Sequence, residues 1–218
     1  MSTDFAPHIQ NRYHQVILSN LLPLLDDQFP RLQAHAAAAL VNFAESAKKQ
    51  HLAPHLTMII QKLLNLLSTN KMYLQEQLLT TIATIADSAE DAFVKFYDGI
   101  MPLLIGIMRQ AVAKEYRLVR GKAIECATLI ALAVGKQIFM PHAQEVLLLL
   151  RDIQQTIVDA DDPQTAYLIS AWARMCKVLG EDFLPYIDYV MKPLLVTAKV
   201  RPDFQAIDST QNYLHDLG

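Results

Sequence analysis

Two histidines, His51 and His55, have the four-residue spacing at which imidazoles on one face of a helix can hold a zinc ion. Pro54 lies between them, however, and proline breaks the helix that would bring both rings to one face. No cysteine or carboxylate motif accompanies the pair in the sequence. We therefore expect a turn between helices with exposed imidazoles, and no metal site.

The other reactive side chains do not form a catalytic pattern. The six glycines are scattered, and no Gly-x-Ser-x-Gly, Walker loop or Gly-x-Gly-x-x-Gly occurs. Cys126 and Cys176 lie in apolar helical segments without a histidine nearby, and we expect both to be buried structural thiols. The sequence thus predicts that the chain is not an enzyme and uses no cofactor.

An acidic loop and two arginines allow more than one interpretation. Asp159, Asp161 and Asp162 could bind a cation or a basic peptide, or form a solvated connector with a helix N-cap, and we expect the connector. Arg117 and Arg120 lie at the start of a predicted helix. We expect them to make ion pairs between repeats rather than to contact a ligand.

The composition indicates helices throughout. Of the 218 residues, 52% are hydrophobic, glycine is scarce, and apolar residues recur every three or four positions. A formal net charge of −3 argues against nucleic acid as a main partner, because binding phosphates requires a basic face. The longest apolar run, Cys126 to Val134, is half a membrane span. With two cysteines, the composition is typical of a soluble protein of a reducing compartment.

A repeated pattern organises the chain. A Leu-Leu pair recurs at intervals of 39 to 47 residues, a period typical of HEAT or armadillo repeats. Proline precedes three of the pairs, and the kink it introduces into a first helix favours HEAT repeats. The pairs are Leu24-Leu25, Leu63-Leu64, Leu103-Leu104, Leu147-Leu148 and Leu194-Leu195.

The predicted fold is therefore all-α, a HEAT-repeat solenoid of about five two-helix repeats. Its divisions are residues 1–7, the tail of a truncated repeat; repeats 8–50, 51–90, 91–135 and 136–180; and an incomplete repeat, 181–218. Second helices are predicted at 31–48, 72–89, 116–134 and 163–179. Gly135 and Gly180 are expected to end two of them. Because neither end has a polar capping repeat, we expect a segment of a longer array.

The second helices of a HEAT solenoid line its concave side, and one polar stripe recurs on them. On the first it contains Asn42 and Glu45; displacement by one repeat gives Thr80, Thr84 and Asp87. A further displacement gives a less polar set that begins with Lys122 and Glu125 and continues with leucines.

Side chains of these types suit an extended basic peptide. Amides can hold the backbone of such a peptide, and carboxylates can pair with its lysines. The alternative is that any exposed helix face is polar. Trp172 is expected in the core, whereas Arg174, two residues on, is expected to reach the concave side.

Several phrases resemble a known family. They are residues 31–43 (RLQAHAAAALVNF), 120–126 (RGKAIEC), 132–136 (LAVGK), 161–164 (DDPQ) and 169–177 (ISAWARMCK). In this order and spacing they resemble the importin beta-3, or importin-5, branch of the β-karyopherins, over essentially the whole chain up to about Pro202.

The resemblance implies the middle of a nuclear import receptor that shuttles between cytoplasm and nucleus. Such receptors bind lysine-rich localisation signals of cargo on the concave face, here Asn42, Glu45, Thr80, Thr84, Asp87, Glu125 and Arg174. It implies possible binding of nucleoporin repeats on the convex side. Ran-GTP binding is expected of the full-length receptor rather than of this segment. A HEAT scaffold or adaptor subunit without a transport role is the alternative.

Overall fold

The computed structural model describes residues 3–69, 71–159 and 161–199, and in these ranges the chain is helical without strands. Two compact units are distinguished, Met1–Leu184 and Pro185–Gly218. The second contains α10 (Ile187–Lys199). The predicted all-α HEAT solenoid is confirmed, and the description below concerns the first unit.

Four pairs of long helices succeed one another in this unit. The first helices of the pairs are α1 (His8–Leu21), α4 (Leu56–Leu67), α6 (Tyr97–Gln110) and α8 (Lys136–Thr156). The second helices are α2 (Pro30–Ala44), α5 (Met72–Ala89), α7 (Arg117–Val134) and α9 (Gln164–Leu179). These four ranges agree with the predicted second helices except that α2 ends four residues earlier.

Short helical turns lie between the long helices, both within and between the pairs. They are η1 (Leu22–Asp26), α3 (Lys49–Leu52), η2 (Glu90–Phe96), η3 (Lys114–Tyr116) and η4 (Gly180–Tyr186). Pro23 lies in η1, where α1 tightens into a 3₁₀ turn, whereas Pro102 lies inside α6. Proline therefore accompanies the first helices as the sequence predicts, but it ends one of them and is included in the other.

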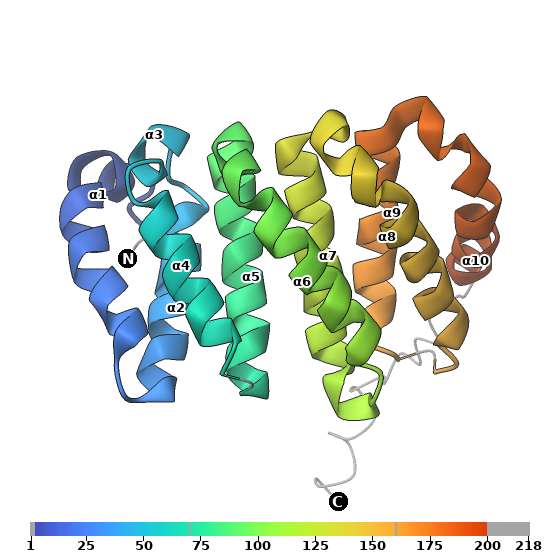
Figure 1. Ribbon diagram of the computed structural model, residues 1–218, viewed down its shortest axis with the longest axis horizontal. Coiled ribbons are helices and arrows are strands. Elements are labelled where there is room, and N and C mark those ends of the chain that lie inside the picture. Colours follow the sequence, from blue (N-terminus) through green and yellow to red (C-terminus); the bar gives the residue numbers. More distant parts are fainter. Residues whose placement is uncertain (1–2, 70, 160, 200–218) are drawn as a thin grey trace, which may run out of the picture. The chain divides into compact units, whose positions relative to one another are not determined.

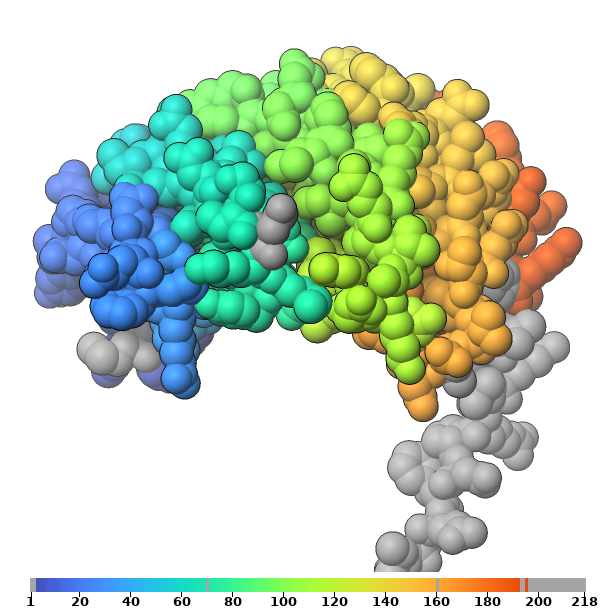
Figure 2. All heavy atoms as spheres, turned by 60° about the horizontal axis from the view of Figure 1, so that its bottom comes forward, coloured from blue at the N-terminus to red at the C-terminus, as the bar shows by residue number. Residues whose placement is uncertain are grey.

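The helices form two layers. Second helices pack side by side in the order α2, α5, α7 and α9, and each first helix packs on its own second helix. Figure 1 shows α4 and α6 crossing in front of α5 and α7. In Figure 2 the coloured spheres of the first unit form an arch that is hollowed along its lower edge.

The core lies between the two layers. In α4 the residues Leu56, Ile59, Ile60, Leu63 and Leu67 are all buried, at the three- and four-residue spacing that places them on one face. The facing stripe of α5 includes Leu78, Ile82 and Ile85, which are also buried. Burial of such side chains is worth about 1.5–3 kcal/mol each, so this seam fixes how the two layers pack.

Three second helices are each followed by a residue with a positive φ. Gly135 and Gly180 follow α7 and α9 with φ of 81° and 59°, as predicted for the helix-ending glycines. Glu90 follows α5 with φ of 50° and ψ of −129°, a conformation that glycine adopts more readily than other residues. These positions are 45 residues apart, so they define the structural period.

Candidate functional site

Two carboxylates lie at the ends of neighbouring second helices. Glu45 is the residue that ends α2, Asp87 lies in the last turn of α5, and both are exposed. Neither carboxylate has a hydrogen-bond or ion-pair partner within the described ranges. A helix C-terminus carries a partial negative charge, so both carboxylates add to a negative potential that already exists there. The pair suits a cationic ligand.

Hydrogen bonds between α5 and α2 align the C-terminal ends of the two helices, which carry these two carboxylates. Ser88 Oγ donates to the Ala44 carbonyl at 2.9 Å, and Thr81 Oγ1 donates to the Ala37 carbonyl at 3.3 Å. Ser88 is next to Asp87 in the chain, and Ala44 is next to Glu45. Asn42 is exposed on α2, one turn before Glu45.

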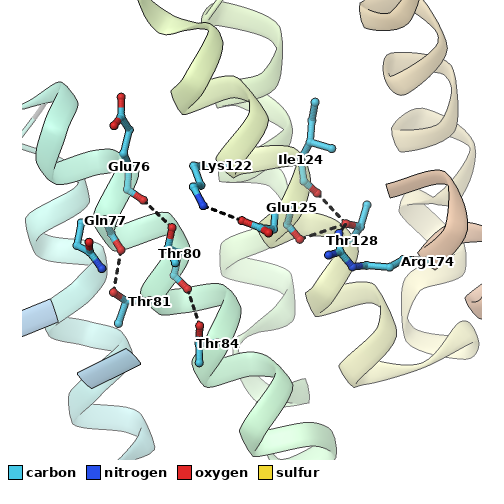
Figure 3. Close-up of polar contacts among 10 residues, drawn as sticks. All are labelled: Glu76, Gln77, Thr80, Thr81, Thr84, Lys122, Ile124, Glu125, Thr128 and Arg174. Carbon is cyan, nitrogen blue, oxygen red and sulfur yellow. Dashed lines mark hydrogen bonds and ion pairs between the residues drawn. The ribbon is translucent and has the colours of Figure 1, made fainter. Parts of the chain in front are cut away.

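The hydroxyl groups of Thr80 and Thr84, the two threonines of the predicted stripe, donate hydrogen bonds within α5. Thr80 Oγ1 donates to the Glu76 carbonyl and Thr84 Oγ1 to the Thr80 carbonyl, both at 3.1 Å (Figure 3). A hydroxyl bonded in this way retains only its acceptor capacity. Both are partly exposed, so they can accept a hydrogen bond from an amide or ammonium group of a ligand but cannot donate one.

Glu125 of α7 differs from Glu45 and Asp87 because it is already paired. Lys122 Nζ lies 3.1 Å from Glu125 Oε2 and 5.1 Å from the centroid of the Tyr167 ring of α9. Figure 3 shows Lys122 directed toward Glu125 along α7. Burial alone would lower the pKa of Lys122, but Tyr167 and Glu125 together raise it. Its ammonium group is therefore stably charged.

Arg174 of α9 reaches back to α7. Its Nη1 donates to Thr128 Oγ1 at 3.2 Å, and the side chain is half-buried (Figure 3). Trp172 is buried as expected, and its Nε1 donates to Gln154 Oε1 at 2.6 Å. The structure thus brings Arg174 next to the α7 residues of the stripe, and places the indole in the core.

Two contributors were missed by sequence reasoning. Glu76 on α5 is half-buried; burial raises the pKa of this carboxyl, and the charge of Lys122 opposes the rise. Tyr167 supplies the aromatic ring beside Lys122. Tyr167 could have been found from the 45-residue period, because Gln77, Lys122 and Tyr167 occupy equivalent positions in successive repeats.

The acidic loop combines two exposed aspartates, Asp159 and Asp161, with the buried Asp162. Arg117 Nη1 lies 3.1 Å from Asp159 and 3.0 Å from Asp162, whose side chain is 1% exposed. Asp162 also accepts from the backbone N–H of Gln164, the first residue of α9, at 2.8 Å. The ion pair between repeats is confirmed for Arg117. Arg120 instead donates to the Met108 carbonyl at 2.7 Å, inside its own helix pair.

The expectation for two other side chains was wrong. His51 is buried rather than exposed, because its ring stacks on that of His14 with centroids 4.4 Å apart. Cys176 is exposed, whereas Cys126 is buried as expected. Among the described residues, no three His, Cys, Asp or Glu side chains lie close enough together to hold a metal ion.

Comparison with known proteins assigns this architecture to a class. Residues 15–217 match the family described as "Importin subunit beta-1-like, TPR repeats". The 45-residue period is longer than the 34 residues of a typical TPR motif, in keeping with HEAT repeats. The chain belongs to the importin-β family of α-solenoid proteins.

Within that family the chain is similar to importin beta-3. It is 45% identical to importin subunit beta-3 of Saccharomyces cerevisiae over 97% of this chain and 19% of the relative. It is 30% identical to a probable importin-5 homolog of Dictyostelium discoideum over 72% of this chain and 14% of the relative. The predicted resemblance to the importin beta-3 branch is confirmed. The chain spans about a fifth or less of the length of these curated relatives.

Solved structures give the same result. The crystal structure of Kap121p bound to Pho4p matches with a TM-score of 0.88 at 44% identity, covering 97% of this chain and 20% of that one. Kap121p has also been crystallised bound to Nup53p, and as a variant in which three acidic residues are replaced by lysine. Among the described residues, no helix has both the length and the apolar character needed to span a membrane.

Proposed function

We propose that this chain is a segment of a nuclear import receptor that binds lysine-rich segments of cargo on the face formed by its second helices. The observation that carries the proposal is the pair of exposed, unpartnered carboxylates of Glu45 and Asp87 on adjacent helix ends, in a chain of the importin-β family. Charge-assisted contacts with carboxylates are the strong hydrogen bonds available to lysine ammonium groups.

In this proposal an extended peptide crosses α2, α5 and α7. Asn42 bonds the peptide backbone, Glu45 and Asp87 take ammonium groups, and Thr80 and Thr84 accept hydrogen bonds. Glu125 on α7, which Lys122 holds in an ion pair, and Arg174 on α9 are the remaining residues of the proposed site. The triple lysine variant of Kap121p supports the assignment, because its changed acidic positions follow one another at intervals close to one repeat, as Glu45 and Asp87 do.

Fluorescence titration with a labelled lysine-rich peptide tests the proposal. Kd should rise between about 50 mM and about 300 mM salt, because exposed charges are screened. Glu45→Lys and Asp87→Lys should each weaken binding further, by about three- to tenfold. Asp98→Lys is the matched control, since Asp98 is exposed on the first helix α6. Equal effects at all three positions would contradict this site.

Nucleoporin repeats are proposed as a second class of partner, on the first helices. Val16 of α1, Met58 of α4, Leu103 of α6 and Met140 of α8 expose apolar side chains there. The complex of Kap121p with Nup53p supports the general idea for a relative. Ran-GTP is proposed to act on the full-length receptor, which shuttles between cytoplasm and nucleus. A HEAT scaffold without a transport role remains the alternative, and absence of peptide binding in the titration would favour it.

A further inference from the structure

Lys122 contacts side chains from two neighbouring second helices. Glu125 lies on α7 together with Lys122, and Tyr167 lies on α9. We call these three residues the Lys122 cluster. The Lys122 side chain is 22% exposed and that of Glu125 is 25% exposed, so the ammonium group is largely covered by the chain itself.

A glycine makes the aromatic wall of this cluster possible. A Cβ atom at Gly121 would lie 2.4 Å from Cδ2 of Tyr167, a separation that real Cβ atoms essentially never show. Only the bare backbone of Gly121 therefore lets the Tyr167 ring lie against α7 next to Lys122. The ring is held where an ammonium group can approach it.

The side chains around Lys122 have the chemistry that recognises a lysine from another chain. An ammonium group is attracted by the face of an aromatic ring and forms strong hydrogen bonds with carboxylates. Tyr167 supplies the ring, and Glu125 supplies the carboxylate. The ammonium group of Lys122 itself interacts with both.

We propose that Lys122 is a resident lysine that fills a lysine-binding site formed by Glu125 and Tyr167, and so prevents a cargo lysine from binding at this repeat. The inference rests on the proposed function and makes it more specific. Glu45 and Asp87 present free carboxylates on α2 and α5, whereas the carboxylate on α7 is occupied. The receptor segment therefore selects peptides whose lysines match the first two positions and not the third.

Removal of the Lys122 side chain should open the site to a free amine. Lys122→Ala should bind n-butylammonium, which has the length and charge of a lysine side chain, and its chemical shifts near Tyr167 should titrate with the amine. The unmodified chain should not respond. Lys177→Ala is the control, because it removes one exposed positive charge from α9 without vacating the Lys122 cluster. Adding Tyr167→Leu to Lys122→Ala should abolish the response.

A peptide titration gives the second readout. Lys122→Ala should bind a lysine-rich peptide about three- to tenfold more tightly, the gain expected for one partly desolvated ammonium over an aromatic ring. Lys122→Gln, which retains most of the stem, should show a smaller gain and covers the case in which the alanine variant folds poorly. The Lys177→Ala control should gain less than twofold at about 300 mM salt, where long-range charge effects are screened.

The two readouts separate the two proposals. Amine binding by Lys122→Ala together with no peptide binding by any form would retain the resident-lysine site and reject the import-receptor groove. Folded Lys122→Ala and Lys122→Gln variants that neither bind the amine nor bind peptide more tightly would overturn the inference. The same holds if Lys177→Ala gains as much as Lys122→Ala.

Discussion

The Tyr167 ring lies against the backbone of Gly121, so closely that a single added methyl group would overlap it. This contact couples the two helices α7 and α9 on the face that carries the proposed site. It predicts that the effect of Gly121→Ala depends on Tyr167. In the native background the substitution should destabilise the chain by ~1–3 kcal/mol through overpacking.

In a Tyr167→Ala background the same Gly121→Ala change should instead stabilise the chain by about 0.5–1 kcal/mol, because alanine favours a helix over glycine. Urea unfolding of the four chains gives the coupling energy directly. If Gly121→Ala has the same sign in both backgrounds, the contact does not determine the packing there.

Glu45 and Asp87 are expected to lower the unfolding free energy of the chain and to strengthen its binding of a lysine-rich peptide. Both carboxylates lie at helix C-termini, where negative charge is unfavourable by about 0.3–1 kcal/mol. Glu45→Gln and Asp87→Asn are therefore expected to raise the unfolding free energy by a few tenths of a kcal/mol and to weaken binding of a lysine-rich peptide. Thermal unfolding and peptide titration on the same samples test this, and loss of stability in both variants would contradict it.

The stacked histidines predict a loss of stability in acid. Burial lowers the pKa of His51, and the nearby charges of His14 and Lys48 lower it further. The unfolded chain therefore binds the proton more readily, and stability present above pH about 6.5 is lost as pH falls toward the folded-state pKa. Melting temperatures between pH about 7.5 and about 5 should fall steeply in the native chain.

The matched variants for this acid effect are His51→Gln and His35→Gln. His51→Gln should flatten the decline between pH about 6.5 and about 5, because the group that takes up the proton is gone. His35 is exposed on α2, so His35→Gln should leave the decline unchanged. An unaltered decline in His51→Gln would assign the acid effect to other groups.

Glu90 predicts a stabilising substitution. It has a positive φ at the position where the next two repeats have Gly135 and Gly180. A non-glycine residue in such a conformation costs about 1–3 kcal/mol, so Glu90→Gly should raise the unfolding free energy by an amount in this range. Glu90→Ala keeps the strained backbone and should not stabilise. Equal effects of glycine and alanine would point to the lost charge instead.

The sequence was sufficient for the helices and their order. The three- and four-residue spacing of apolar side chains predicts α5 at residues 72–89 as the structure has it. The C-terminal boundary of α2 was placed too late, because Glu45, Ala47 and Lys48 are good helix formers although the chain already turns after Ala44.

The side-chain environments could be predicted only where both partners lie on one element. Lys122 and Glu125 are three residues apart on one helix, so their pairing was legible in the sequence. His51 could not be assigned in the same way, because the ring that buries it, His14, lies in the preceding repeat. The Tyr167 ring packs against Gly121 of the neighbouring helix, and no local sequence pattern predicts such a contact.

The left-handed residues 90, 135 and 180 keep one interval, whereas the Leu-Leu pairs vary between 39 and 47 residues. Variation is therefore absorbed between the left-handed positions, at the start of the first helix. The 7 residues of η2 precede α6, which has 14 residues, whereas α8 follows Gly135 directly and has 21 residues. Differences of this kind leave the succession of second helices in register. The first helices can therefore vary in length while the second helices keep the same spacing of side chains toward a bound peptide.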